Sequence, residues 1–237
     1  MRFGGAMNDA AAIDIGVYTV PQARRLTGIS GARIRRWLRG YEHGRSDARR
    51  QSSPVWRAQL APVDDQFALG FLDLMEVRFV DAFLKAGLSL AKIRRAAQLA
   101  KELVGKEHPF STQKFRTDGK RIFAQVETSG RDRKTFDLES AQFEIHDEIA
   151  PSLLKGVEFD AEGQAARWRP YQHDMPRVVL DPRHQFGQPM IDRGGPQTSV
   201  IADAVKAEGS IDAVAKWFEI DRDAVRQAVE FEIRLAA

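Results

Sequence analysis

The chain has 237 residues, of which 43% are hydrophobic and 29% charged, and a formal net charge of +3. This length allows one large domain or two smaller ones. The absence of cysteine excludes a disulfide framework, thiolate zinc sites and cysteine nucleophiles, and fits a reducing compartment. No apolar stretch approaches the roughly 20 residues that span a bilayer, and acidic residues stand where a signal peptide would be apolar. We therefore expect a cytoplasmic protein without a membrane partner.

The small net charge conceals an asymmetry along the chain. The first 60 residues hold eleven arginines and four acidic residues, a net charge of +7, which leaves −4 for the remainder. A basic head on an acidic body indicates a polyanionic partner for the head. The alternative is a solvated arginine surface that has no partner.

The first periodic segments predict a helix-turn-helix. Residues 1–16 lack periodicity and are expected to be a flexible tail. A short helix then begins after Thr19 and ends at Gly28, and Ser30 can cap a second helix over residues 31–42. Two helices joined by a short glycine turn are typical of DNA-binding proteins.

The second of these helices has two distinct faces. At about 100° per residue, one stripe holds the apolar side chains Ile34, Trp37, Leu38 and Tyr41, and four arginines lie opposite it. A helix of this width fits the major groove, where an arginine can pair with guanine or hold a phosphate. The predicted DNA-binding residues are Arg24, Arg25, Ser30, Arg33, Arg35, Arg36 and Arg39. The alternative is a solvated helix whose arginines pair with acidic residues elsewhere.

The segments that follow predict a wing or linker and then two long helices. Residues 43–66 are polar, with a short strand expected around Val55 and Trp56. An amphipathic helix is expected over residues 71–87, and Ser89 can cap another over 90–105.

The pattern changes after residue 106. Short strands are expected at 120–128 and 133–140, and a hairpin within 155–170 that turns at Glu162 and Gly163. The turn-rich segment 178–196 indicates a domain boundary. Three helices are then expected, over residues 197–209, 210–220 (capped by Ser210) and 222–235 (capped by Asp221).

Together these elements predict a mainly α fold with small β elements. The expected organisation is a tail at 1–16, a winged helix-turn-helix domain with a helical extension at 17–105, a β-rich connecting segment at 106–175 and a C-terminal three-helix, helix-turn-helix-like domain at 176–237.

Nothing in the sequence indicates an enzyme. The five histidines lack metal-ligand spacing, and His146, beside Asp147 and Glu148, fits a solvated polar run better than a metal site. Phosphate-binding, hydrolase and dinucleotide motifs are absent from the sequence. We expect no catalytic residue, no metal and no cofactor.

Two stretches resemble the winged-helix head of MerR-like regulators: "YTVPQARRLTGISGARIRRWLRGYE" and "FLDLMEVRFVDAFLKAGLSLAKIRRA". The order of "PVW", "FLDLMEVRFV", "GLSLAKIRRA", "HPFST", "FRTDGKRIF" and "AVEFEIRL" is similar to VapB-like antitoxins of type II toxin–antitoxin modules. This resemblance runs from about Val17 to Leu235. The C-terminal domain of those proteins often has G-T-R after "G-x-P-x-I-x", whereas here "GQPMI" is followed by "DRGGPQTSVI", with Arg193 nearby.

The resemblance implies a DNA-binding antitoxin whose C-terminal helical domain has no known function. Its partner would be a VapC-like ribonuclease toxin of PIN fold, which uses clustered carboxylates and a divalent metal and is blocked at its active-site cleft. The complex would repress its own operon. The protein would be a homodimer on double-stranded operator DNA, since such proteins commonly read paired half-sites. Residues 71–87 could form part of the dimer seam or be buried in their own domain.

The main alternative is a free-standing MerR-like transcriptional regulator with a ligand-sensing or protein-binding C-terminal half. An aromatic-lined pocket would favour ligand sensing. The candidate lining residues are Phe110, Phe115, Phe123, Phe136 and Trp168, which plain core packing would equally explain. A third possibility is a protein-interaction module with no affinity for DNA.

Overall fold

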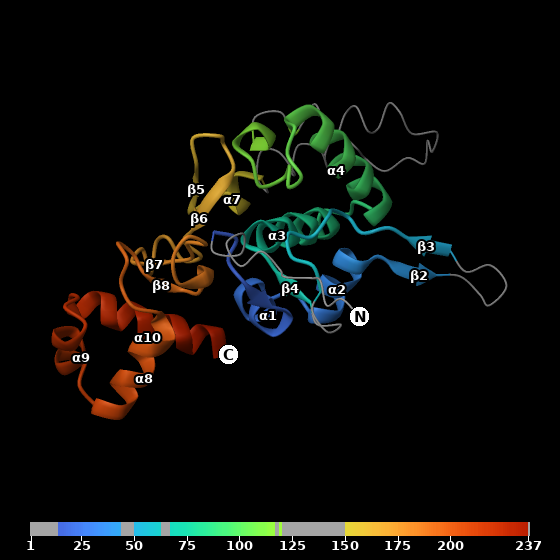
Figure 1. Cartoon of the computed structure of the whole chain (residues 1–237). Coiled ribbons are helices and arrows are strands. Elements are labelled where there is room, and N and C mark those ends of the chain that lie inside the picture. Colours follow the sequence, from blue (N-terminus) through green and yellow to red (C-terminus); the bar gives the residue numbers. More distant parts are fainter. Residues whose placement is uncertain (1–13, 44–49, 63–66, 117–118, 120–149, 237) are drawn as a thin grey trace, which may run out of the picture. The chain divides into compact units, whose positions relative to one another are not determined.

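The computed structural model describes residues 14–43, 50–62, 67–116, 119 and 150–236. These residues form helices joined by short strands, and the strand pairs β2–β3 and β7–β8 are antiparallel (Figure 1). The expected mainly α fold with small β elements is confirmed. Contacts divide the chain into a first unit, Thr19–Ala165, and a second unit, Met1–Tyr18 with Ala166–Ala237. Within the described ranges, no helix combines the length and apolarity that crossing a membrane requires.

Two short helices with well-defined caps open the first unit. α1 (Val20–Thr27) is capped by the hydroxyl of Thr19 and ends at Gly28, whose φ is 72°. α2 (Gly31–Arg39) is capped by the hydroxyl of Ser30. Both helices therefore begin where the sequence predicts, and both N-terminal caps are confirmed.

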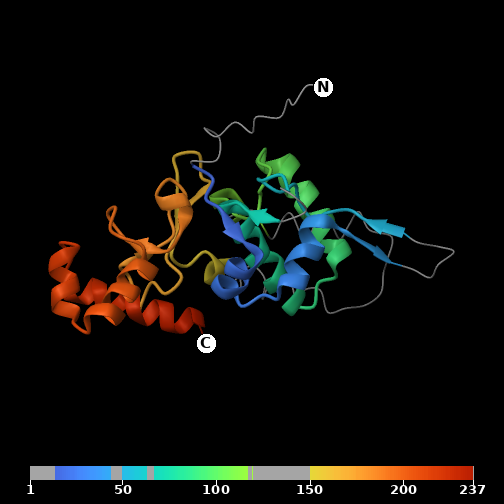
Figure 2. The same cartoon turned by 60° about the horizontal axis from the view of Figure 1, so that its bottom comes forward.

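α2 ends at Arg39 instead of residue 42, because the chain turns sharply at Gly40. Tyr41 belongs to β2 (Tyr41–His43), which pairs with β3 (Arg50–Ser52). The φ of Gly40 is 76°, and a Cβ atom there would lie 2.0 Å from the backbone oxygen of Ser52, so only glycine fits. Both views show the hairpin extending away from the helices of its unit (Figures 1 and 2). Tyr41 is therefore not part of the apolar stripe of α2.

The strand expected around Val55 and Trp56 is wrong, since residues 53–58 form none. Both side chains are buried. The backbone N–H of Val55 donates to the carbonyl oxygen of Trp37 at 2.9 Å, and the indole of Trp56 donates to Asp73 at 2.8 Å. These two bonds hold the segment against α2 and α3, so its apolar side chains face a core and not a partner strand.

α3 (Phe71–Lys85) is the central helix of the first unit. No residue from 71 to 84 is exposed, and ten side chains of the helix are buried. α3 contacts α1, α4 (Leu90–Val104), β4 (Ala68–Leu69) and α7 (Ala150–Leu153) (Figure 1). Of the two alternatives expected for this helix, a dimer seam or burial in its own domain, its coverage within one chain favours burial.

Aromatic side chains fill the core against α3. Phe79 and Phe83 of the helix meet Phe110 and Phe115, with ring centroids 4.9–6.3 Å apart. All four are at most 1% exposed. Phe110 and Phe115 therefore pack as core and do not line a ligand pocket. Of the other aromatic candidates, Trp168 is buried in the second unit, and Phe123 and Phe136 lie outside the described residues, as do the strands expected at 120–128 and 133–140 and the histidine at 146.

A buried carboxylate connects distant parts of the first unit. Asp73 is fully buried and accepts hydrogen bonds from the indole of Trp56 at 2.8 Å, the backbone N–H of Gly70 at 2.9 Å and that of Gln59 at 3.0 Å. His108 Nε2 lies 3.0 Å from the same carboxylate. Because buried polar groups are costly when unpaired, this cluster stabilises only one arrangement of the three segments that meet at Asp73.

A second buried carboxylate lies one turn further along α3. Glu76 Oε1 accepts from the backbone N–H of Ser111 at 3.0 Å and from its hydroxyl at 3.1 Å. Its other oxygen, Oε2, has no hydrogen-bond partner among the described residues. Burial raises the pKa of Glu76 to about 7. Burial alone would lower the pKa of His108, but the hydrogen bond to Asp73 and the charge of Glu76 outweigh it and raise that pKa.

The connection towards the second unit runs through β5 (Val157–Phe159) and β6 (Ala165–Trp168). Gly163, at φ 74°, donates its N–H to the carbonyl oxygen of Asp160 at 3.1 Å. The tight turn predicted at Glu162 and Gly163 is confirmed.

Loops and two short strands make up the first part of the second unit. β7 (Val178–Val179) pairs with β8 (Met190–Ile191), and the hydroxyl of Tyr18, in β1 (Tyr18–Thr19), donates to the carbonyl oxygen of Gly187 at 2.7 Å. The turn-rich segment 178–196 thus lies inside this unit. The domain boundaries expected after residues 105 and 175 stay predictions.

Three helices complete the second unit: α8 (Thr198–Glu208), α9 (Ile211–Trp217) and α10 (Arg222–Ala236). They contact one another, as Figure 1 shows. The predicted caps are confirmed, since Ser210 accepts the N–H of Ala213 and Asp221 accepts the N–H of Ala224.

Candidate nucleic-acid interface

α2 has the two faces that the sequence predicts. Ile34, Trp37 and Leu38 are at most 5% exposed, so they anchor the helix in the first unit. Every arginine of α2 is at least partly exposed. Burial of one apolar stripe thus fixes which way the basic face of the helix points.

Three arginines of the α1–α2 pair have no acidic partner among the described residues. Arg24 and Arg25 lie in the last turn of α1, Arg35 lies in the middle of α2, and all three are exposed. No carboxylate among the described residues forms an ion pair with any of them. Their charges remain available to a polyanion, as the DNA-binding hypothesis requires.

Aromatic rings orient two further arginines. The guanidinium of Arg36 lies 3.7 Å from the centroid of the Tyr41 ring, and that of Arg39 lies 4.3 Å from the centroid of Phe67. Hydrogen bonds from Arg36 and Ser52 hold the pKa of Tyr41 below its usual value. Stacking of this kind restricts a long side chain without neutralising its charge, which would lower the entropy lost on binding a polyanion.

Arg33 differs from the other predicted contacts because it already has a partner. Its guanidinium lies 2.8 Å from a carboxylate oxygen of Asp81 on α3 and 5.0 Å from the Trp37 ring centroid. Asp81 also pairs with Lys85 at 2.8 Å. At this position α3 brings a carboxylate to the arginine face, so Arg33 fits the alternative in which an arginine pairs with an acidic residue elsewhere. Ser30 acts as a helix cap, and its side chain accepts the N–H of Arg33 at 3.4 Å.

A groove next to the hairpin was not predicted from the sequence. It has a volume of about 520 Å³, and its charged lining residues are Arg57, Arg94, Lys101 and Glu107, of which Lys101 and Glu107 pair at 2.7 Å. Arg94 Nε donates to the carbonyl oxygen of Ser53 at 2.8 Å, and its guanidinium lies 5.6 Å from the Tyr41 ring centroid. The sequence signal for it is the arginine pair in "KIRRA", Arg94 and Arg95, which lies on α4.

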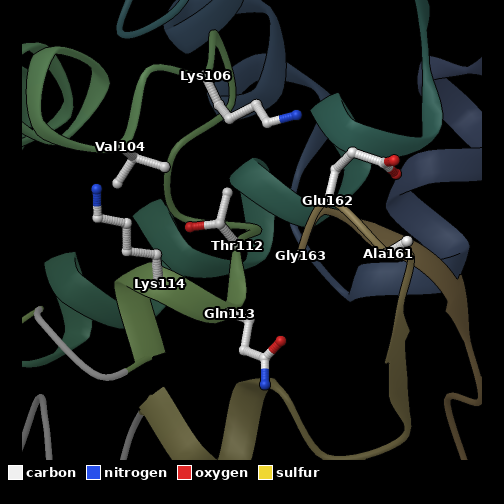
Figure 3. A pocket seen from close by; sticks show the side chains of 8 residues that line it. All are labelled: Val104, Lys106, Thr112, Gln113, Lys114, Ala161, Glu162 and Gly163. Carbon is white, nitrogen blue, oxygen red and sulfur yellow. The ribbon is translucent and has the colours of Figure 1, made fainter.

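A second hollow of about 440 Å³ lies between the start of the helical turn at 113–116 and the turn after β5. Figure 3 shows Lys106, Lys114 and Glu162 around it. Lys114 donates to the carbonyl oxygen of Leu103 at 2.5 Å, and the hydroxyl of Thr112 donates to the carbonyl oxygen of Pro109 at 2.7 Å. Because these polar groups already serve the fold, and both signs of charge are present, we assign no ligand class to this hollow.

Across the described parts of the chain, no three histidine, aspartate or glutamate side chains lie together in a way that could hold a metal ion.

Comparisons with known proteins identify a relative and a solved structure that each align over most of the chain. No family model matches the chain. A Mycobacterium tuberculosis (strain ATCC 25618 / H37Rv) protein named "Putative antitoxin VapB45" is 26% identical over 226 residues, which cover 92% of this chain and 94% of that protein. The X-ray crystal structure of Rv2018 from Mycobacterium tuberculosis matches with a TM-score of 0.68 at 24% identity, covering 92% of this chain and 99% of that one. The structural match shows that the fold is shared over most of the chain.

Proposed function

We propose that this protein is a DNA-binding antitoxin that neutralises a VapC-like ribonuclease of PIN fold and represses its own operon. The observation that carries the DNA-binding part is the exposed basic surface of α1 and α2, where Arg24, Arg25 and Arg35 have no acidic partner among the described residues. The antitoxin part is supported by a relative of that name that aligns over most of both chains. In this proposal the protein is a non-enzymatic cytoplasmic regulator.

In the DNA complex, α2 would lie in the major groove. Its buried stripe would face the first unit, and Arg35, Arg36 and Arg39 would reach base edges or phosphates. Arg24 and Arg25, at the end of α1, would hold the adjacent backbone, and the hairpin β2–β3 would act as the wing. The protein would bind as a homodimer to half-sites about one helical turn, or roughly 34 Å, apart. We leave the dimer seam unassigned, because α3 is covered within one chain.

Replacing Arg35 and Arg39 together by alanine is expected to weaken binding to the protein's own upstream DNA on the order of 100-fold. Each guanidinium that is lost removes a base or phosphate contact. Each lost phosphate contact makes the negative slope of log affinity against log salt shallower by about 0.9. Fluorescence anisotropy at several salt concentrations measures both quantities.

Arg226→Ala is the matched control for this double variant. Arg226 is an exposed arginine on α10 of the second unit, so its removal subtracts the same kind of charge away from the proposed interface. Equal affinity of the double variant and the wild type would rule out α2 as the recognition helix. Arg33→Ala is a poorer probe, because it also breaks the pair with Asp81.

Co-expression with the product of the neighbouring gene tests the antitoxin role. We expect the two proteins to elute as one complex, and ribonuclease activity to appear only when this chain is removed. A protein that binds its own promoter but forms no complex would instead be a free-standing regulator. A chain with neither activity would contradict the whole proposal.

A further inference from the structure

The groove between residues 53–57 and α4 has a surplus of positive charge. Glu107 is the one acidic residue in its lining; it pairs with Lys101 at 2.7 Å, and Arg57 also lies close enough for its charge to help hold the pKa of Glu107 low. Neither Arg57 nor Arg94 forms an ion pair with a described carboxylate. One carboxylate therefore faces three cations, and the groove favours an anion.

Arg94 is held in place at one side of this groove. Its Nε donates to the carbonyl oxygen of Ser53 at 2.8 Å, and its guanidinium lies 5.6 Å from the centroid of the Tyr41 ring. The enclosed Nη2 of the same group has no hydrogen-bond acceptor among the described residues. The fold thus orients this guanidinium without using all of its donors, and such pre-organisation lowers the entropic cost of binding an anion.

Tyr41 connects the groove to the basic face of α2. The guanidinium of Arg36 lies 3.7 Å from the centroid of the ring that Arg94 also approaches. The backbone N–H of Val55, in the wall of the groove, donates to the carbonyl oxygen of Trp37 at 2.9 Å and so fastens this wall to α2. Two like charges beside one ring repel each other unless an anion lies near them. A polyanion along α2 would supply that charge at both positions.

We propose that this groove binds a backbone phosphate of the DNA beside α2, with Arg94 and the exposed Arg57 as its ligands. The inference rests on the proposed function and adds a contact outside the surface of α1 and α2. Guanidinium groups suit a phosphate diester because their N–H donors match its oxygens in pairs. Such a contact fixes the position of the protein on the duplex and reads no sequence.

The first test is a double variant, Arg57→Gln with Arg94→Gln, measured by fluorescence anisotropy at several salt concentrations. We expect affinity for the protein's own upstream DNA to fall about 10-fold and the negative salt slope to become shallower by about 0.9, as loss of one phosphate contact does. The preference for this DNA over a scrambled duplex should not change, because phosphates carry no sequence information.

Two single variants complete this test. Arg95→Gln is the matched control, because Arg95 is the exposed neighbour of Arg94 on α4 and does not line the groove. It should bind within about twofold of the wild type, since a distant surface charge is screened by salt. Arg57→Gln alone is expected to weaken binding about threefold. Its exposed side chain leaves the fold intact, so it carries the test if the double variant does not fold.

The second test locates the phosphate on the DNA. Duplexes that carry one neutral methylphosphonate each are compared for the wild type and the double variant. At the phosphate that occupies the groove, neutralisation should weaken the wild type about 10-fold and leave the double variant almost unchanged. Equal losses for both proteins at every position would overturn the inference.

The remaining outcomes separate this inference from the proposed function. A wild type that prefers its upstream DNA, together with a double variant of equal affinity, overturns only the groove contact. If the double variant loses affinity for inorganic phosphate alone but keeps its affinity for DNA, the groove takes a free anion and the DNA contact is likewise overturned. If the wild type shows no preference for its upstream DNA, the proposed function fails and this inference fails with it.

Discussion

Asp73→Ala is expected to lower the free energy of unfolding by about 3–5 kcal/mol, the largest effect of a single substitution that we predict. The fully buried Asp73 carboxylate pairs with the indole of Trp56, two backbone N–H groups and the imidazole of His108. Removing it leaves these donors buried without an acceptor, which costs more than the net value of the bonds themselves. Chemical denaturation monitored by circular dichroism measures the loss.

Two further variants make this prediction specific. Asp73→Asn keeps one acceptor oxygen and is expected to lose about half as much stability. Glu102→Ala removes an exposed acidic residue from α4 of the same unit and is expected to stay within about 0.5 kcal/mol of the wild type. A loss below about 1 kcal/mol for Asp73→Ala would mean that the carboxylate does not hold the three segments together.

The free energy of unfolding is also expected to fall as the pH rises from about 5 to about 8. Burial raises the pKa of Glu76 from 4.5 to about 7 in the folded protein. A group whose pKa is higher in the folded protein than in the unfolded chain stabilises the fold. This contribution is present in full below the pKa of the unfolded chain, and it is lost as the pH rises through the pKa of the folded protein. For Glu76 this loss is on the order of 3 kcal/mol at most. The pKa of His108 is also raised, so its contribution to stability likewise falls as the pH rises above 6.5.

Glu76→Gln isolates this contribution. Its amide oxygen can still accept from Ser111, but the side chain no longer ionises, so the curve of stability against pH should be flatter between pH 5 and 8. Measurements should stay above about pH 5, where Asp221 does not add its own pH dependence. The hydrogen bond from Arg177 holds the pKa of Asp221 low, so the stability that this ion pair contributes is lost as the pH falls below 3.8. Parallel curves for the variant and the wild type would contradict the assignment to Glu76.

Local chemistry in the sequence was sufficient to place most helices. Thr19, Ser30, Ser89 and Ser210 each cap a helix as predicted, because a cap depends on a side chain and a backbone N–H only three residues apart. Apolar spacing likewise identified the buried stripe of α2. The end of α2 was misplaced, because Gly40 turns the chain to let β3 approach, and that approach depends on residues ten or more positions away.

In the candidate interface, too, the sequence predicted local features and missed contacts between distant residues. Spacing alone assigned four arginines to one face of α2, and their positions on the helix are as expected. Only the tertiary structure decides that Arg33 pairs with Asp81, that Arg36 and Arg39 stack on Tyr41 and Phe67, and that Arg94 lies beside the same hairpin. Partners brought together from distant parts of the chain leave no local pattern, since burial and packing create these contacts only after folding.

The sequence by itself therefore determined the basic head, the helix pair with its caps and the mainly α character of this protein, all of which follow from composition and short-range periodicity. The tertiary structure alone decided the burial of Asp73 and Glu76, the coverage of α3 within one chain and the groove between residues 53–57 and α4. Each of these depends on which segments meet in space, and the free energy that selects that arrangement belongs to the packed chain as a whole.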